Sequence, residues 1–136
     1  MDRNLRILGI ANNAGLLAVG GDAVSKAAIS GKAKLIISAS DASEGSRRRA
    51  QINAETGFTL HIDTPYMKHE YGNVSRRGSP GTLAVLDIGL AARFMKGLAE
   101  TYPGQYAQEA ELLADEARRL KEKKRQSAPG KRRTAQ

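Results

Sequence analysis

Residues 16–43, LLAVGGDAVSKAAISGKAKLIISASDAS, decide the fold of this chain. The apolar residues 16–19 predict a short strand, and Asp22 is a suitable N-cap for a helix that ends at Gly31. KLIISAS, residues 34–40, is a nearly continuous, Ile-rich apolar run, which is typical of a strand buried on both faces. A strand, a helix and a buried strand in this order predict a β-α-β unit.

The same alternation continues on both sides of this unit. A helix is expected over residues 2–13, and Asp41 with Glu44 three residues later predicts a capping box for a helix that runs to about residue 55. FTLHID, residues 58–63, alternates between apolar and polar side chains like a half-buried strand. Residues 73–81 have the composition of a loop.

The last elements of the alternating pattern lie between residues 64 and 100. Thr64 followed by Pro65 predicts the start of a short helix near residues 65–71. TLAVLDI, residues 82–88, is a further buried strand, and Asp87 caps the helix after it. Four strands that alternate with helices predict the α/β class, as a three-layer α/β/α sandwich with a mixed, mostly parallel central sheet.

Residues 1–100 are therefore expected to form the α/β/α domain, 101–125 an additional amphipathic helix, and 126–136 a disordered basic tail. A single apolar stripe predicts that the additional helix, over residues 105–125, lies against the domain. Its members are Tyr106, Ala110, Leu113, Ala117 and Leu120.

The net charge of +8 lies entirely in residues 118–136, which carry nine basic residues and one acidic residue. The preceding 117 residues carry 13 basic and 13 acidic residues, so their charges cancel. A neutral domain with a basic tail is typical of an accessory nucleic-acid arm, although a tail that merely increases solubility remains an alternative. Non-specific phosphate contacts are expected from Lys123, Lys124, Arg125, Lys131, Arg132 and Arg133.

Several classes of protein are excluded or disfavoured by composition. The chain has no cysteine and no apolar run that approaches the ~20 residues of a membrane helix, so a cytoplasmic protein without a membrane partner is expected. His61 is expected to be a packed strand residue, and His69 beside Glu70 has no third metal ligand nearby. No nucleophile elbow or catalytic carboxylate pair is present, which predicts a non-catalytic protein without a cofactor, a metal or a small-molecule substrate.

The aromatic residues are too few for a surface on which single-stranded bases stack. The chain has two Phe and four Tyr, and Phe58 and Phe94 are expected in the core. An RNA-binding domain that reads unpaired bases on an aromatic sheet is therefore disfavoured.

The glycine pair in GGDAVSK, residues 20–26, has three open explanations. In the first, Asp22 caps the helix and Lys26 is a solvated charge. In the second, Gly20 and Gly21 let RNA approach the backbone, the helix N-terminus favours phosphate, and Lys26 reaches a base or a phosphate. The third, a mononucleotide site, is disfavoured because the segment matches neither a Walker loop nor G-x-G-x-x-G.

Four basic residues in turns and loops fit the second explanation, in which RNA contacts the glycine pair. Two lysines follow the glycine-started helix and can form a basic edge beside Lys26, and two loop arginines can reach phosphates or stack on unpaired bases. These four residues are Lys32, Lys34, Arg76 and Arg77. The three consecutive arginines at 47–49 point in directions about 100° apart, so they are expected to form a solvated helix face.

Taken together, residues 4–100 resemble the bacterial YlxQ-type branch of the L-seven-Ae/L-thirty-e family of kink-turn-binding ribosomal proteins. The resemblance rests on LGIANNAG, the glycine-started helix, SGKAKL, SDAS after the buried strand, and the D-x-G that opens the helix after residue 86. It implies an α/β/α sandwich that binds structured RNA, a kink-turn or ribosomal RNA, in ribosomes or translation. It also implies that the loop before the last strand lies beside the glycine motif and holds the RNA with Arg76 and Arg77.

The family's RNA-contacting motif reads Gly-x-Asn-Glu-x-x-Lys, and this chain matches it at Gly20 and Lys26. Asp22 and Ala23 stand where the motif has Asn and Glu. An ionised Asp only accepts hydrogen bonds and repels phosphate, and Ala cannot accept from a guanine edge. These two residues support an alternative function, a protein–protein adaptor on the same scaffold without specific RNA recognition.

Overall fold

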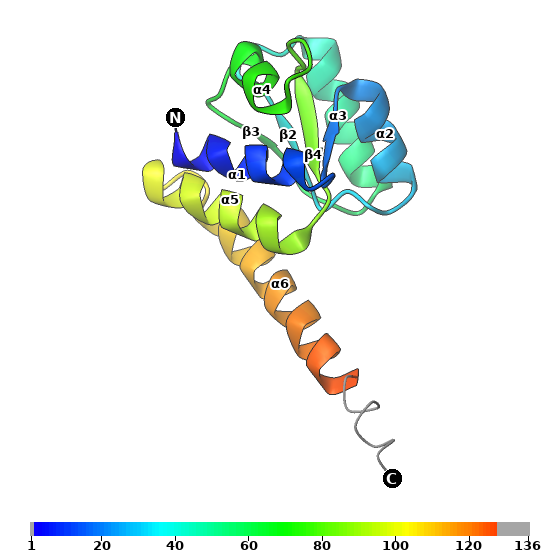
Figure 1. Ribbon diagram of the computed structural model, residues 1–136, viewed down its shortest axis with the longest axis vertical. Helices are drawn as coiled ribbons and strands as arrows, with labels where there is room; N and C mark the ends of the chain where they lie inside the picture. Colours follow the sequence, from blue (N-terminus) through cyan, green and yellow to red (C-terminus); the bar gives the residue numbers. More distant parts are fainter. Residues whose placement is uncertain (1, 128–136) are drawn as a thin grey trace.

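A four-stranded sheet organises the chain in the computed structural model, which describes residues 2–127 (Figure 1). Its strands are β1 (Leu17–Val19), β2 (Leu35–Ser38), β3 (His61–Asp63) and β4 (Thr82–Val85). The helices are α1 (Arg3–Asn13), α2 (Gly21–Ile29), α3 (Glu44–Thr56), α4 (Lys68–Ser75), α5 (Ile88–Thr101) and α6 (Ala107–Ser127). None of the helices among these residues is long and apolar enough to cross a membrane.

The strands lie in the order β1-β4-β2-β3, and only β2 and β3 pair in parallel. The α/β/α sandwich with a mixed sheet and an extra C-terminal helix is confirmed: β1, β2 and β3 run in the same direction, and β4 is antiparallel to both of its neighbours. The chain leaves β3 at Asp63 and enters β4 at Thr82. Both residues pair with Ser38 of β2, at one end of the sheet. Because this connection begins and ends at the same end, β4 runs back between β1 and β2.

Successive strand residues point to opposite faces and build two separate cores. Leu35, Ile37 and Leu83 belong to the larger core, which also contains side chains of α1, α4, α5 and α6. Ile36 and Ala84 belong to the smaller core with α2 and α3, which is built mainly from alanines. Both faces of the central strands are thus buried, as the apolar runs predict.

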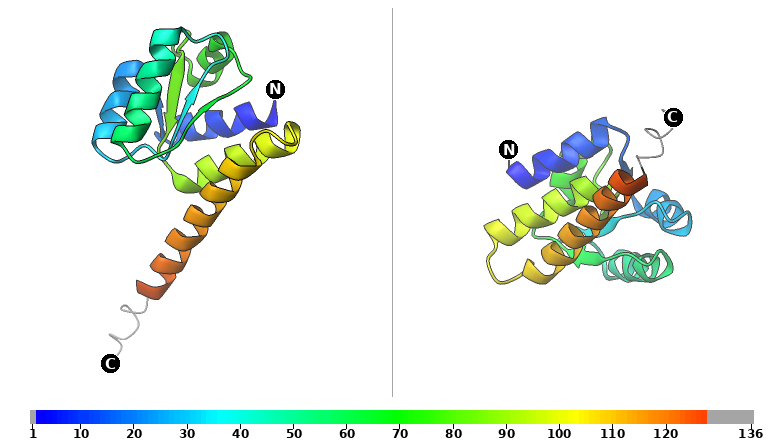
Figure 2. Two further views of the ribbon diagram at one scale, coloured as in Figure 1. Left: turned by 180° about the vertical axis from the view of Figure 1, so that it is seen from behind. Right: turned by 90° about the horizontal axis from the view of Figure 1, so that it is seen from below.

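The two helical layers lie on opposite sides of the sheet (Figure 2, right). Helices α2 and α3 pack side by side on one side, and α1 and α5 pack together on the other. The outer surface of the α1–α5 layer therefore faces away from α2 and α3.

Three predicted helix starts differ from the structure. The N-cap of α2 is Gly20 instead of Asp22, which lies inside the first turn. The N-cap of α3 is Ser43, whose hydroxyl accepts from the Ser46 N–H, so the predicted Asp41–Glu44 capping box is wrong. Asp41 instead accepts a 2.8 Å hydrogen bond from the Lys68 N–H.

The predicted helix at 65–71 begins three residues later, at Lys68, and continues to Ser75 inside the predicted loop. The Thr64 hydroxyl does not cap it, because it donates to the Ser38 carbonyl at 3.0 Å. The predicted cap at Asp87 is confirmed, since its carboxylate accepts from the Leu90 N–H at 2.9 Å.

Phe58 lies on the surface with 97% of its area exposed, so its predicted place in the core is wrong, whereas Phe94 is fully buried as predicted. Phe58 has a φ of 51° in the turn after α3, and β3 begins only at His61. The preceding Gly57 packs against the backbone of Ala28, which fixes this turn at the protein surface.

The first part of α6 packs against α5, and its second part projects from the body (Figures 1 and 2). Leu113 is 1% exposed and belongs to the larger core, and Ala117 packs against that core. Leu120, the last member of the predicted stripe, is 40% exposed. The helix ends at Ser127, two residues beyond the predicted boundary with the tail.

Candidate functional site

Gly20, Gly21 and Asp22, named here the glycine turn, connect β1 to α2 at the end of the sheet where β4 begins. Gly20 has a φ of 91°, a left-handed backbone that favours glycine. Its N–H donates to the Thr82 carbonyl at 3.0 Å, and its carbonyl accepts from the Val24 N–H at 2.9 Å. The turn is therefore held between the first strand, the last strand and the second helix.

Arg49 from α3 reaches the glycine turn and pairs with Asp22. Its Nη2 atom lies 3.0 Å from the Asp22 Oδ1 atom, and the side chain of Asp22 is 93% exposed. A Cβ on Gly21 would lie 2.8 Å from Nη1 of Arg49, so the glycine leaves space for the guanidinium. Sequence reasoning missed Arg49, because its partner lies 27 residues away and no local pattern connects the two.

Lys26 shares one face of α2 with Asp22, since the two residues are four positions apart. Lys26 is exposed, so its ammonium group is accessible beside the Asp22–Arg49 pair. The turn thus presents a helix N-terminus, one carboxylate and two cations within a small area.

The loop 76–81 meets the same end of the sheet. Gly81 accepts a 2.8 Å hydrogen bond from the Ala39 N–H, and the next residue is the Thr82 that binds Gly20. The loop packs closely on α4, because a Cβ on Gly72 would lie 1.9 Å from the Gly78 carbonyl oxygen. Arg76 and Arg77, at the start of this loop, are exposed.

Lys32 and Lys34 lie at the other end of the sheet, so they do not extend a basic edge beside the glycine turn. The Lys34 N–H donates to the Val85 carbonyl at 2.8 Å, at the end of β4, whereas Gly20 contacts the beginning of that strand. Lys34 instead lines a hollow of about 230 Å³ together with Arg119 and Lys123 of α6.

The basic half of α6 is exposed up to its last described side chains. Arg118 pairs with Asp115 one turn earlier. Of the six expected phosphate contacts, Lys123, Lys124 and Arg125 are exposed on the projecting part of α6. Lys131, Arg132 and Arg133 lie outside the described residues.

Ser38, His61 and Asp63 form a contact that does not have the geometry of a catalytic triad. The Ser38 hydroxyl is 2.7 Å from the His61 Nε2 atom, but Asp63 approaches the same nitrogen, at 3.9 Å. Ser38 is fully buried, so no substrate reaches its hydroxyl. Burial lowers the pKa of His61; Asp63 raises it and Arg47 lowers it further, so the packed imidazole is neutral at pH 7.

Three tyrosines also have altered acidity for structural reasons. Burial raises the pKa of Tyr66, Tyr71 and Tyr106. Tyr71 is hydrogen-bonded to the Thr64 hydroxyl, and Tyr66 donates to Asp2 at 3.0 Å. Within residues 2–127, no group of three His, Asp or Glu side chains is placed to hold a metal ion.

The chain is an α/β/α sandwich with a mixed sheet, and solved structures share this fold. A protein of unknown function from Bacillus halodurans C has a TM-score of 0.65 at 20% identity, over 72% of this chain and 98% of that chain. A 15.5 kD RNA binding protein from Giardia lamblia has a TM-score of 0.55 at 15% identity, over 71% and 82%. No protein-family model and no curated protein matches the sequence.

Proposed function

We propose that this chain is a non-catalytic structured-RNA-binding protein of the kink-turn-binding type that acts in ribosomes or translation. Its central contact is the glycine turn with Lys26 and Arg49. Arg76 and Arg77 hold the RNA from the adjoining loop, and the basic end of the chain adds affinity that does not depend on sequence.

The observation that carries this proposal is that the glycine turn lies against Thr82, the residue that follows the loop 76–81, at one end of the sheet. The 3.0 Å hydrogen bond from Gly20 to Thr82 ties them together. A left-handed glycine without a Cβ, an exposed helix N-terminus and nearby Lys and Arg side chains are features that suit close phosphate approach. The RNA-binding neighbour from Giardia lamblia, which has the same fold, supports the same assignment.

The Asp22–Arg49 pair explains how an acidic residue is accommodated in an RNA-facing turn. The guanidinium offsets the carboxylate, and it offers further N–H donors to a phosphate from the same position. The adaptor alternative rests on Asp22 and Ala23, which stand where the family's motif has Asn and Glu.

A binding measurement separates the two functions. The full chain is titrated with a kink-turn RNA and with a duplex of equal length across a salt series, by fluorescence anisotropy. We expect tighter binding to the kink-turn at every salt concentration. Equal affinities for the two RNAs exclude kink-turn recognition, and an absence of binding to either RNA at low salt favours the adaptor.

Lys26→Ala is expected to weaken kink-turn binding by about 1–3 kcal/mol, because Lys26 contacts a base or a phosphate beside the glycine turn. Lys32→Ala is the matched control, since it removes the same exposed charge at the other end of the sheet. The measurement is the anisotropy titration at 0.15 M salt. Equal losses in the two variants would place Lys26 outside the site.

Asp22→Asn is expected to strengthen RNA binding about three- to tenfold, because it removes a negative charge near phosphate and releases Arg49. Glu55→Gln, which neutralises an exposed carboxylate near the end of α3, is expected to change the affinity much less. A decrease in affinity on Asp22→Asn would show that the carboxylate itself contacts the RNA.

Arg49→Gln is expected to weaken RNA binding, with Arg48→Gln as its control.

A further inference from the structure

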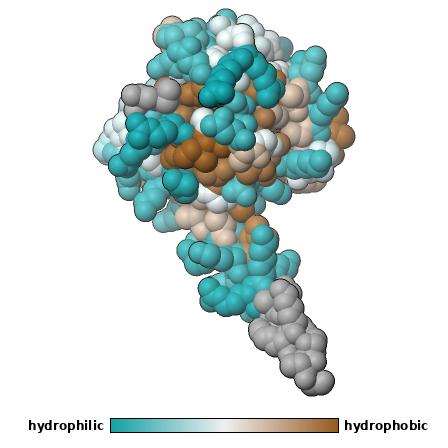
Figure 3. Space-filling view, viewed as in Figure 1, coloured by the Kyte–Doolittle hydropathy of each residue, from teal (hydrophilic) through white to brown (hydrophobic). Residues whose placement is uncertain are grey.

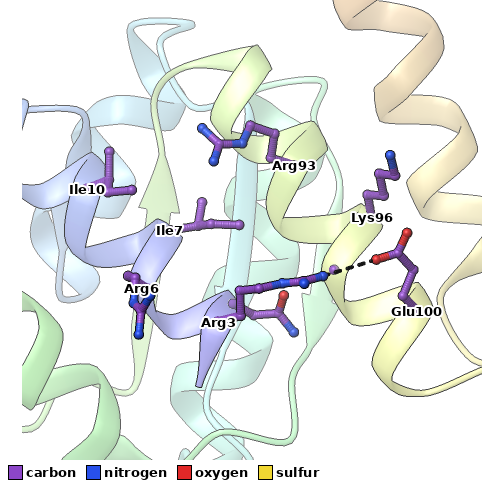
Figure 4. A pocket seen from close by; sticks show the side chains of 9 residues that line it. Arg3, Arg6, Ile7, Ile10, Arg93, Lys96 and Glu100 are labelled. Carbon is purple, nitrogen blue, oxygen red and sulfur yellow. Dashed lines mark hydrogen bonds and ion pairs between the residues drawn. The ribbon is translucent and has the colours of Figure 1, made fainter. Parts of the chain in front are cut away.

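A second surface with a defined chemistry lies on the opposite layer, in the groove between α1 and α5. The groove has a volume of about 570 Å³ (Figure 4). Its floor includes Ile7 and Gly97, and Ile10 continues it along α1. The rest of its lining is mostly charged: Arg3, Arg6, Arg93, Lys96 and Glu100.

The groove is strongly basic although the body of the protein is neutral. It has four cations and one carboxylate, and the carboxylate of Glu100 lies 3.4 Å from Arg3. Among the described residues, Arg6, Arg93 and Lys96 form no salt bridge. Since the first 117 residues carry equal numbers of acids and bases, this concentration of positive charge is local to the groove.

The groove is also apolar between its two charged sides. Ile10 is 44% exposed on α1, and Figure 3 shows hydrophobic residues over the centre of this face, surrounded by hydrophilic ones. A smaller hollow of about 210 Å³ continues along α1 and shares Arg6 and Ile10 with the first. The two hollows therefore meet at Ile10, the exposed apolar residue of this stretch of α1, with Arg6 beside it.

From this arrangement we infer that the α1–α5 groove binds an acidic amphipathic helix of a partner protein. Apolar residues of such a helix, at i, i+3 and i+7, cover Ile10, since Ile7 is already buried in the larger core. Flanking Asp or Glu residues pair with Arg6 on one side and Arg93 and Lys96 on the other. RNA fits less well, because phosphates leave Ile10 uncovered and the lining contains no aromatic ring on which a base could stack.

This surface is independent of the glycine turn. The groove is formed by α1 and α5, whereas the glycine turn opens α2 on the other side of the sheet (Figure 2). A partner helix in the groove therefore leaves the glycine turn and Lys26 accessible, whereas Arg76 of the proposed RNA contact lines the smaller hollow that continues along α1.

The first test uses synthetic helical peptides with the full chain at 0.15 M salt. The probe carries Leu at i, i+3 and i+7 and Glu at the flanking positions, with a fluorescent label for anisotropy. Two comparison peptides replace all Glu by Gln or all Leu by Ser. We expect both comparison peptides to bind at least about tenfold more weakly than the probe. No binding of the probe at millimolar concentration, or equal binding of the Leu→Ser peptide, overturns the proposal.

The second test locates the binding. The double variant Arg6→Glu/Arg93→Glu is expected to weaken probe binding at least about tenfold, whereas the control Lys32→Glu/Arg48→Glu reverses two charges elsewhere and is expected to have little effect. Glu100→Gln removes the one acid of the groove and is expected to increase the affinity. This gain cannot result from misfolding. Equal losses in the two double variants, or a groove variant that loses RNA binding and keeps peptide binding, contradict the inference.

Discussion

Truncation after Ala117 is expected to lower the affinity for duplex RNA about a thousandfold at 0.15 M salt and to flatten its salt dependence. The removed residues, 118–136, carry nine basic residues and one acidic residue. Each phosphate that a cation neutralises contributes about 0.9 to the slope of log K against log salt on B-form DNA, and we take the same value for the A-form RNA duplex. Four such contacts reduce the slope by roughly 3.6, which corresponds to about three decades between 1 M and 0.15 M salt.

The truncation keeps the part of α6 that stabilises the body, because Leu113 and Ala117 pack against the larger core. The matched control keeps the full length and replaces the nine basic residues of 118–136 by Gln. It is expected to lose as much affinity as the truncation, as measured by anisotropy at four salt concentrations. An unchanged slope in either variant would show that this segment does not contact phosphate.

Gly97→Ala is expected to destabilise the protein by about 2–5 kcal/mol, because α1 and α5 approach each other too closely for a side chain at this position. A Cβ there would lie 1.8 Å from the Oδ1 atom of Asn4. Asn4 is buried, and its amide donates to the Tyr66 hydroxyl at 3.1 Å and the Thr101 hydroxyl at 3.3 Å. The substitution therefore overpacks the helix contact and leaves buried polar groups without partners.

Thermal unfolding followed by circular dichroism checks this prediction, with an expected fall in Tm of roughly 10–20 °C. Gly9→Ala is the matched control, since Gly9 lies inside α1 and a Cβ there would have nothing within 4 Å, and it is expected to stabilise slightly. Asn4→Ala added to Gly97→Ala is expected to recover part of the lost stability, because it removes the clash. Equal melting of the Gly97→Ala variant and the native chain would contradict the close approach.

Local sequence patterns predict the elements well and their ends less well. Residues 34–40 and 82–88 are identified as buried strands because continuous apolar runs fit a strand covered on both faces, and β2 and β4 lie inside them. The residue at which a helix begins depends on a single capping hydrogen bond, and several nearby side chains can compete to make that bond. Asp22 and Asp41 are good capping residues, but each has a partner elsewhere, in Arg49 and the Lys68 N–H.

The candidate site is predictable only in part. The glycine turn follows from the local sequence, because Gly20 and Gly21 stand between a strand and a helix. Lys34 is close to the glycine turn in the sequence, which is why it is expected in the same site. The antiparallel pairing of β2 with β4 instead puts Lys34 at the other end of the sheet, near α6.

The sequence by itself determined the alternation of strands and helices, the two-sided burial of β2 and β4, and the separation of a neutral body from a basic end. These properties depend on the period of apolar residues and on charge counts, which are local. Tertiary structure alone decided the reversed direction of β4, the pairing of Asp22 with Arg49, and the basic groove between α1 and α5. Each of these brings together residues far apart in the chain, and their contacts are set by how the layers pack.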